Sequence, residues 1–287
     1  MLERVVCVLP SRDEAETIEQ VLSDLIATLS KVEGVKLEKI ILSDDSIDQT
    51  REISRNFELV EIIDGGGALG RAMYRGLKRS LKYNPDIILS LDSDGQLDMQ
   101  EVVRFIEVFR KDEVDLLLGS RFIGGDLIDY KYPFINKIGV VLLSTFLSIA
   151  TGKRVTDSHG GLRVMRRKFV EAVKVAGSHT YVQETIIYAA KKGFKFKEVE
   201  SVWLLRKSGG SRVVGNIPKY IVRTLPYMLY RSDYDLRLIL PASVVFIIYA
   251  NYLQSNLLYF LGTLLLVMAV FLRILGMRGD RQDALSA

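Results

Sequence analysis

The amino-acid sequence predicts an α/β fold: a mostly parallel sheet with helices on both faces, followed by a C-terminal two-helix transmembrane hairpin. The sheet is predicted from residues 1–125, where short apolar runs alternate with amphipathic segments. That alternation is typical of repeated strand–helix units, which build parallel sheets. The hairpin is predicted from Leu238–Leu275, an apolar stretch in which Arg273 is the only charged residue.

Strands are expected where short apolar runs end in polar residues or glycine. They are Val5–Leu9, Lys39–Leu42, Leu59–Ile63, Asp86–Leu91 and Leu116–Gly119. Helices are expected between these runs, where apolar residues recur every three or four positions. They are Ala15–Leu29, Thr50–Asn56, Leu69–Lys82 and Gln100–Arg110. Cys7, the only cysteine, lies in the first strand, so we expect a small core residue and no internal disulfide or cysteine-based metal site.

The strand–helix rhythm lapses from about Tyr130. Phe134–Ala150 is expected to be an apolar helix, either in the core or at a membrane surface. Asn216–Tyr230 mixes basic and apolar residues and is expected to be an interfacial segment. The predicted organisation is therefore a catalytic domain over 1–215, an interfacial segment over 216–235, two transmembrane helices over 236–276 and a cytoplasmic tail over 277–287.

Gln254–Asn256 interrupts the long apolar stretch and leaves two segments, 238–253 and 257–275. A membrane helix needs about 17–25 residues, so the first is marginal unless it begins nearer Tyr234. A buried helical hairpin is the alternative, but apolar residues on every face and flanking Tyr and Arg favour the membrane. Basic residues flank the pair and are absent from its loop, which by the positive-inside rule places both ends and the catalytic domain in the cytoplasm. They are Lys219, Arg223, Arg231, Arg237, Arg278 and Arg281.

The composition sets broad limits on the class of protein. A chain of 287 residues with 48% hydrophobic residues can bury a sizeable core. The formal net charge is only +4, but Lys and Arg crowd into 163–168, 191–197, 206–223 and 231–237, which suits phosphates, nucleic acid or anionic lipid. We expect no secretory signal, because Met1–Leu9 is short and acidic residues follow it.

Polar residues gather at the carboxyl ends of the expected strands, the edge where open α/β sheets bind ligands. They are Pro10–Glu14, Ser43–Ser46, Gly65–Gly70, Asp92–Gln96 and Gly119–Arg121. One shared site explains this pattern better than separate surface features.

The segment Asp92-x-Asp94-x-Gln96 raises the question of how neighbouring carboxylates are tolerated, because like charges repel unless a cation lies between them. An EF-hand is excluded, because glycine is fourth here and position twelve is Val103. A surface turn remains an alternative. A divalent-metal site is favoured, because Mg²⁺ commonly binds one or two carboxylates together with substrate phosphates.

Gly65-x-Gly67-x-x-Gly70 matches the dinucleotide-binding fingerprint, which makes an NAD-binding enzyme the alternative from another class. Against it, the motif follows the third strand instead of the first. A further basic loop, Arg206-x-x-Gly-Gly-Ser-Arg212, could fork onto phosphate oxygens or could be a solvated loop. His159 and His179 are not spaced as metal ligands.

Taken together, these segments resemble the dolichol-phosphate mannose synthases and related polyprenyl-phosphate glycosyltransferases, which are inverting family 2 enzymes of the GT-A fold. The resemblance covers roughly residues 4–215 and rests on motifs in a shared order. They are Pro10-x-x-x-Glu14, Ser43-Asp-Asp-Ser-x-Asp48, Leu69-Gly-x-Ala72, Asp92-x-Asp-x-Gln96, Gly119-Ser-Arg121, Asp157-x-x-Gly-Gly-Leu-Arg163, Gln183-Glu184 and Arg206–Arg212.

The resemblance implies roles for individual residues. Asp92, Asp94 and Gln96 would hold Mg²⁺ or Mn²⁺ on the donor diphosphate. Arg121, Arg206 and Arg212 would bind donor and acceptor phosphates, and Asp157 and Glu184 would lie near the sugar or support the site. The expected nucleotide-sugar contacts also include Pro10, Arg12, Glu14, Ser43, Asp44 and Ser93. The catalytic set implied is Asp94, Arg121, Arg206, Asp157 and Glu184.

The expected activity is transfer of a hexose from a GDP-mannose or UDP-glucose type of donor to dolichyl or polyprenyl phosphate in the bilayer, with no nucleic-acid partner. A glycolipid or glycan acceptor is the alternative within the same fold, and it would require a base such as Asp157 or Glu184. The chain departs from the family at Arg12-Asp13, Ser43, Gly65–Gly67 and Arg212. Several of these positions are expected at the nucleotide, so the sequence does not select the base or the sugar, and the oligomeric state stays open.

Overall fold

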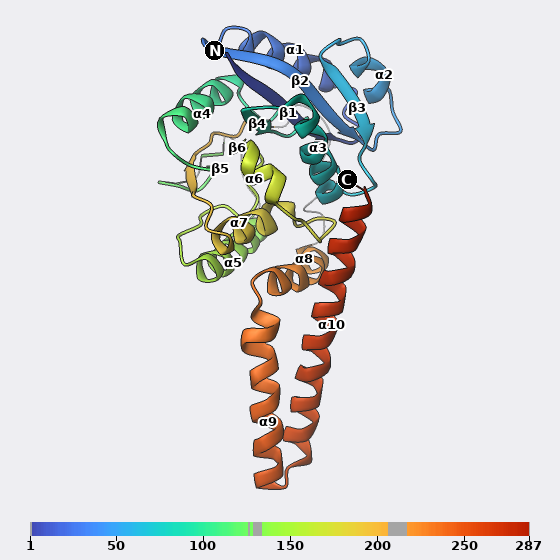
Figure 1. The fold of residues 1–287 in the computed structure, drawn as a ribbon, viewed down its shortest axis with the longest axis vertical. Helices are drawn as coiled ribbons and strands as arrows, with labels where there is room; N and C mark the ends of the chain where they lie inside the picture. The colour runs from blue at the N-terminus through green and yellow to red at the C-terminus, as the bar shows by residue number, and fades with distance from the viewer. Residues whose placement is uncertain (1, 126, 129–133, 206–216, 287) are drawn as a thin grey trace.

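The computed structural model describes residues 2–125, 127–128, 134–205 and 217–286, and side chains within 217–222 only at Tyr220 and within 282–286 not at all. A globular α/β part carries a long helical hairpin at one end (Figure 1). The predicted mostly parallel sheet is confirmed. It has seven strands in the order β3-β2-β1-β4-β6-β5-β7, in which β6 runs antiparallel to both neighbours.

The strands follow the expected apolar runs closely, with two additions. They are β1 Glu3–Ser11, β2 Val35–Asp44, β3 Val60–Asp64, β4 Ile87–Ser90, β5 Leu116–Ser120, β6 Arg163–Arg166 and β7 Phe196–Glu200. The last two were not among the expected strands. β6 has only four residues and carries arginine at both ends, so it lacks the apolar run by which the others are recognised.

Alternating side chains of the strands supply two cores, one on each face of the sheet. In β1, Val6 and Val8 face the cluster that includes α3 and α7, while Val5, Cys7 and Leu9 face the cluster with α1 and α4. Successive residues of a strand point to opposite faces, so a strand covered on both sides is apolar throughout. Cys7 is fully buried as expected, and burial raises the pKa of its thiol.

Helices cover both faces of the sheet and then extend away from it. They are α1 Ile18–Leu29, α2 Thr50–Ser54, α3 Leu69–Ser80, α4 Met99–Lys111, α5 Phe134–Thr151, α6 Arg167–Ala172, α7 Tyr181–Lys191, α8 Ile217–Arg231, α9 Leu240–Leu253 and α10 Asn256–Ser286, with a 3-10 turn at Leu81–Tyr83 and a π-helical turn at Asp235–Ile239. The start of α4 is fixed by a neighbouring side chain. Asp98 accepts a hydrogen bond from the backbone N–H of Gln100 at 2.9 Å and so caps the helix.

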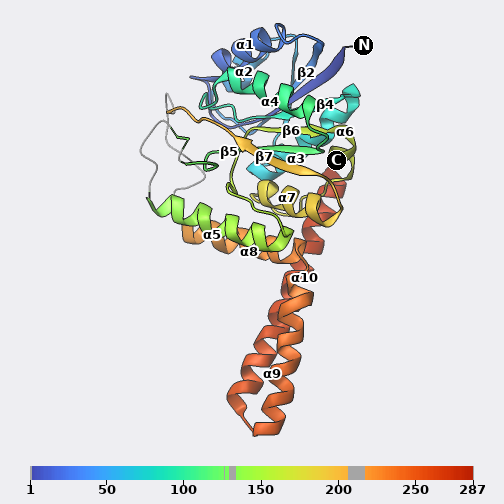
Figure 2. The ribbon, with the colours of Figure 1, turned by 90° about the vertical axis from the view of Figure 1, so that its left-hand side faces the viewer.

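The hairpin consists of α9 and α10, and among the described residues three helices are long and apolar enough to cross a membrane. These are Phe134–Thr151, Asp235–Leu253 and Asn256–Arg281. The expected break lies where predicted, because Gln254 takes a left-handed conformation that ends α9. The expected division between a span ending at 276 and a separate tail over 277–287 does not coincide with a helix end, since α10 continues to Ser286. In Figure 2, α5 and α8 lie across the axis of the hairpin at its base.

Candidate active site

The carboxyl ends of β1, β2 and β4 meet at one edge of the sheet, as expected for parallel strands. Pro10 is in register with Ser43, and the chain after β4 is tied back to β1 because the Ser93 hydroxyl donates to the Pro10 carbonyl at 2.8 Å. The Thr17 hydroxyl donates in turn to the Ser93 carbonyl at 3.2 Å and lies 3.5 Å from a carboxylate oxygen of Glu14. The predicted residues Pro10, Glu14 and Ser93 are therefore brought together.

Asp92 and Asp94, the strand-tip acids, follow β4 at this edge. Burial and the neighbouring carboxylate of Asp94 raise the pKa of Asp92 from 3.8 to about 7, although Arg121 and Arg163 partly oppose the shift. Among the described residues, none donates a hydrogen bond to the Asp92 carboxylate. Asp94 is oriented by the backbone N–H of Gln96, which donates to its Oδ1 at 3.1 Å. The described part of the chain therefore does not fully compensate the negative charge of Asp92.

The strand-tip acids fit a divalent cation as two of its ligands. No group of three or more His, Cys, Asp or Glu within the described residues could hold a metal by itself. Two carboxylates completed by substrate phosphate oxygens are the usual Mg²⁺ arrangement, so the donor set has the right chemistry. Space is also reserved for Asp92: a Cβ on Gly161 would lie 2.3 Å from its Oδ2.

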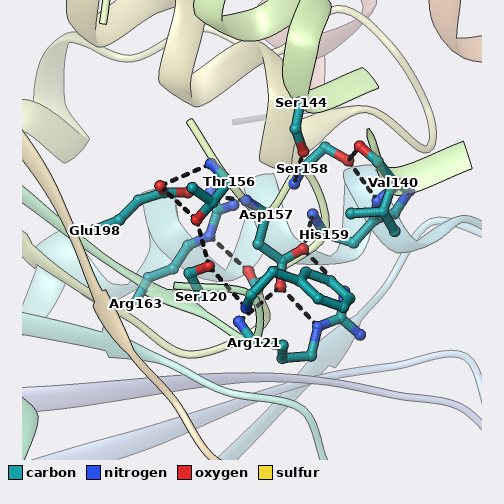
Figure 3. A network of polar contacts seen from close by, with 12 residues as sticks. Ser120, Arg121, Val140, Ser144, Thr156, Asp157, Ser158, His159, Arg163 and Glu198 are labelled. Carbon is teal, nitrogen blue, oxygen red and sulfur yellow. Dashed lines mark hydrogen bonds and ion pairs between the residues drawn. The ribbon is translucent and has the colours of Figure 1, made fainter. Parts of the chain in front are cut away.

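Arg121 and Asp157 form a buried ion pair beside the strand-tip acids (Figure 3). Arg121 Nε donates to Asp157 Oδ2 at 2.7 Å and Nη2 donates to Oδ1 at 2.9 Å, a bidentate geometry. Burial alone would raise the pKa of Asp157, but Arg121 outweighs it and holds that pKa below its usual range. The guanidinium also lies 4.9 Å from the ring centre of Trp203, which packs it from another side.

The loop Asp157–Gly161 brings this ion pair against the strand tips. A Cβ on Gly160 would lie 1.9 Å from the Gly119 carbonyl, so the close approach of loop and β5 requires glycine. His159 in this loop accepts or donates at Nδ1 with the Ser158 hydroxyl at 2.8 Å, and burial lowers its pKa to about 4. Burial therefore disfavours the charged form of His159.

On the β2 side, Asp44 and Asp45 shape the edge of the candidate site. Asp44 accepts from Arg51 Nε at 3.0 Å and from the Ser46 hydroxyl at 2.5 Å. Asp45 accepts the backbone N–H of Gly67 at 2.9 Å and so fixes the turn that precedes α3. The amides of this turn point at carboxylates, since the Gly66 N–H also donates to Asp64, and this differs from a turn that cradles a pyrophosphate.

The side chains of other predicted residues make different contacts. The Ser43 side chain packs under α3, because a Cβ on Gly76 would lie 2.6 Å from its hydroxyl oxygen. Arg12 is exposed and lies 3.9 Å from Asp13. Glu184 lies on α7, buried against Arg231 at 2.9 Å and not among the strand tips. Arg206 and Arg212 lie outside the described residues.

Sequence reasoning gave no individual role to Asp45, Arg163 or Trp203, which the structure places beside the strand tips. Arg163 is buried, donates to the Gly160 carbonyl at 3.1 Å and carries charge close to Asp92 and Asp157. The signals were present, because Asp45 belongs to the acidic turn and Arg163 ends the Asp157-x-x-Gly-Gly-Leu-Arg163 motif. Trp203, the only tryptophan in the sequence, belongs to none of the motifs.

Comparison with known proteins decides the family. The sequence model of the family described as glycosyl transferase family 2 matches residues 6–174, which include all of these strand tips. The chain belongs to this family. It is a glycosyltransferase, and the match overturns the NAD-binding alternative.

Relatives of this family 2 glycosyltransferase occur in archaea and bacteria. The chain is 30% identical over 205 residues to an uncharacterized protein of Methanocaldococcus jannaschii, covering 69% of this chain and 80% of the relative. It is 27% identical over 192 residues to the low-salt glycan biosynthesis hexosyltransferase Agl6 of Haloferax volcanii, covering 67% and 45%. Glucosyl-3-phosphoglycerate synthase of Mycobacterium tuberculosis, solved with Mn²⁺, UDP and phosphoglyceric acid, shares the fold: the TM-score is 0.61, the identity 16%, and 80% of this chain and 78% of that one are covered. The GT-A expectation for the fold is thereby confirmed.

Proposed function

We propose that this glycosyltransferase moves a hexose from a nucleoside diphosphate sugar to a polyprenyl phosphate at the cytoplasmic membrane face, with inversion and with Mg²⁺ or Mn²⁺. The observation that carries the proposal is the position of the strand-tip acids in a domain whose base bears a long apolar hairpin. Two relatives support the acceptor class. One is named UDP-N-acetylglucosamine–dolichyl-phosphate N-acetylglucosaminyltransferase, from Methanococcus voltae, at 24% identity over 67% of this chain and 82% of that one. The other is named undecaprenyl-phosphate mannosyltransferase, from Micrococcus luteus, at 25% over 52% and 62%.

The state of the buried carboxylates favours a phosphate acceptor over a hydroxyl acceptor. A sugar hydroxyl must lose its proton to a base, and the candidates were Asp157 and Glu184. Each is held by an arginine, Arg121 and Arg231 respectively, and accepts several further hydrogen bonds. A phosphate monoester has its second pKa at about 6 and is already ionised at neutral pH, so it needs no such base.

In the proposed reaction an acceptor phosphate oxygen attacks the anomeric carbon of the sugar. The bond from that carbon to the donor diphosphate breaks, and its electron pair leaves with the nucleoside diphosphate. Asp92 and Asp94 would hold the metal, which supplies positive charge that stabilises the leaving diphosphate. Arg121 lies at the same edge, and because Asp157 offsets much of its charge, the metal would supply most of the positive charge that the substrate phosphates meet.

The lipid acceptor is confined to the bilayer, so the membrane arrangement is part of the proposal. We infer two spans, α9 and α10, with both ends in the cytoplasm. The third apolar helix, α5, lies across the hairpin (Figure 2), and its inner residues Val140, Leu143 and Leu147 are buried against the domain. Its outer residues are apolar and exposed, which suits a helix lying in the interface and not a span. They are Phe134, Ile135, Ile138, Val141, Leu142 and Ile149.

The test is a transfer assay with the full chain in lipid nanodiscs. GDP- and UDP-sugars are screened with Mn²⁺ against a polyprenyl phosphate and, in parallel, the corresponding free polyprenol. Transfer to the phosphate and not to the alcohol is expected. Transfer only to a glycolipid or glycan hydroxyl would overturn the proposed acceptor while leaving the family assignment untouched.

The membrane topology has its own test. Single cysteines are placed in a Cys7→Ser background at Ile138 of α5, at Ser255 in the hairpin turn and at Lys36 in the globular part. A membrane-impermeant thiol reagent added to sealed vesicles should reach Lys36→Cys and Ser255→Cys from opposite sides. Ile138→Cys should be protected in lipid and become reactive in detergent-free, delipidated protein. Labelling of Phe134→Cys and Ile149→Cys, near the two ends of α5, from opposite sides would establish a third span instead.

A further inference from the structure

Glu184 is a buried carboxylate on α7, outside the strand tips, and both of its oxygens accept hydrogen bonds. Its Oε2 accepts from the backbone N–H of Ala176 at 2.8 Å and from Arg231 Nη2 at 2.9 Å. Its Oε1 accepts from the Gly177 N–H at 2.7 Å and from the Thr180 hydroxyl. Glu184 therefore joins the loop 176–180, called here the clasp loop, to the last residue of α8.

The clasp loop in turn packs on the first turn of α3. The Ser178 carbonyl accepts the backbone N–H of Gly70 at 2.7 Å, and a Cβ on Gly70 would lie 2.7 Å from the Gly177 and Ser178 carbonyls. This turn of α3 follows Gly67, whose N–H is bound by Asp45 at the tip of β2. A continuous set of contacts thus runs from Glu184 to the nucleotide side of the candidate site.

The other side of Glu184 leads to the membrane hairpin. Arg231 also donates from Nη2 to Asp280 near the end of α10 at 2.7 Å, and Asp280 accepts from the Tyr230 hydroxyl at 2.8 Å. α10 presses on the clasp loop directly, since a Cβ on Gly279 would lie 2.3 Å from the Ala176 carbonyl. The end of α10 is therefore packed against the catalytic domain.

We propose that Glu184, Arg231 and Asp280 form a positioning unit through which the membrane hairpin holds the clasp loop and, by way of α3, the donor side of the active site. This inference rests on the proposed nucleotide-sugar donor. Glu184 is a positioning residue and touches no substrate. The hairpin then does more than confine the enzyme to the bilayer, because the end of α10 completes the support of the donor site.

The physical reason lies in the burial of two of the three charges, Glu184 and Arg231. Glu184 is fully buried and Arg231 is 7% exposed, so neither can exchange its partner for water. Removing one partner of a buried pair leaves an uncompensated charge, and the loop rearranges to solvate it. The clasp loop is the element free to rearrange, because Glu184 itself sits on the rigid helix α7 while Ala176 and Gly177 are loop residues.

The experiment compares donor and acceptor parameters for Glu184→Gln, Arg231→Gln and the double variant in the full chain in nanodiscs. Binding of GDP and UDP with Mn²⁺ is measured by calorimetry, and transfer kinetics give KM for donor and acceptor separately. Each single variant should weaken nucleotide binding by about twofold to thirtyfold, with acceptor KM unchanged. The double variant should lose less than the product of the two single losses, because both break the same unit. Arg231→Lys, which keeps the charge, should restore part of the affinity.

Arg167→Gln is the matched control, because it breaks the exposed Arg167–Glu171 pair of 2.6 Å by the same change. It should leave nucleotide affinity unchanged. If Glu184→Gln fails to fold, Asp280→Asn tests the positioning role in its place. Asp280 is partly exposed, and its loss leaves the other Glu184 contacts in place. A lower melting temperature with unchanged nucleotide affinity in these variants overturns the positioning role. The proposed acceptor fails separately, if the wild type binds nucleotide but transfers no sugar to polyprenyl phosphate.

Discussion

The two acidic side chains Asp157 and Asp92 at the sheet edge differ in where their countercharge comes from. Asp157 receives two hydrogen bonds from the Arg121 guanidinium, and its pKa is held low. Asp92, close to the same arginine, receives no hydrogen bond from any described residue, and burial next to Asp94 raises its pKa to about 7. The negative charge of Asp157 is thus neutralised by a residue of the protein itself. The negative charge of Asp92, in the same neighbourhood, is instead suited to a bound cation.

The comparison shows how a carboxylate that stabilises the fold can be distinguished from one that takes part in the reaction. Burying a charge is costly unless it is paired, so a buried carboxylate without a full partner indicates a ligand, whereas a paired one indicates architecture. By this criterion we propose that Asp157 and Glu184 stabilise the framework and that Asp92 takes part in the reaction. Substituting each should therefore affect stability and activity in opposite proportions.

The largest effect is expected at the strand-tip acids. Asp94→Asn should lower transfer by on the order of a hundredfold or more, because a ligand for the charge-stabilising metal is lost. The metal-free variant should melt no lower than the metal-free wild type, because a like-charge contact with Asp92 is removed. The measurements are transfer rate with Mn²⁺ and thermal unfolding in EDTA. Full activity of the variant, or of the wild type in EDTA, would refute the metal role.

A large loss of stability is expected when the internal countercharge is removed. Arg121→Met leaves Asp157 buried and unpaired, which should cost about 3–5 kcal/mol of unfolding free energy. Adding Asp157→Leu should recover much of this loss, because no uncompensated charge then remains. Denaturant unfolding in detergent measures both. Arg167→Met, on the exposed pair, is the control and should change stability by less than about 0.5 kcal/mol; an equal loss there would remove the distinction between the two pairs.

Gly161→Ala tests the space reserved for Asp92 without changing any charge. Its Cβ would lie 2.3 Å from Asp92 Oδ2, so the carboxylate or the loop must shift. Overpacking of this kind costs about 1–3 kcal/mol, and we expect it to appear as roughly a tenfold to hundredfold loss of transfer. The Mn²⁺ concentration for half-maximal activity should rise in parallel. An unchanged Mn²⁺ requirement would mean that Asp92 does not need its present position.

The smallest effect concerns pH and His159, beside Asp157. Burial lowers its pKa from 6.5 to about 4 in the folded protein. Between these values the unfolded chain binds a proton that the folded protein does not, so stability falls as pH drops from 6.5 towards 4. The loss of unfolding free energy is at most about 3 kcal/mol. It should be smaller than this limit, because the His159 ring is only partly covered. Melting curves from pH 7 to 4 should be flatter for His159→Gln, and identical slopes would assign the acid sensitivity to another group.

Much of the strand-tip site follows from sequence because local patterns set it. The apolar run that ends at Leu91 predicts a buried strand, and parallel strands must bring their carboxyl ends to one edge, so Asp92, Ser93 and Pro10 had to meet there. The break at Gln254 was equally local, because it interrupts an otherwise continuous apolar helix. Such features need only neighbouring residues to be recognised.

The tertiary structure alone decided which charges are paired. Arg121 and Asp157 are 36 residues apart, and Glu184 and Arg231 are 47 apart, so no local pattern reveals their ion pairs. It also decided that the short arginine-flanked β6 enters the sheet antiparallel between β4 and β5. The physical reason is common to both: pairing energy depends on distance and burial, which long-range packing creates. Sequence determined where the acids lie along the strands, and packing determined which of them the protein neutralises itself.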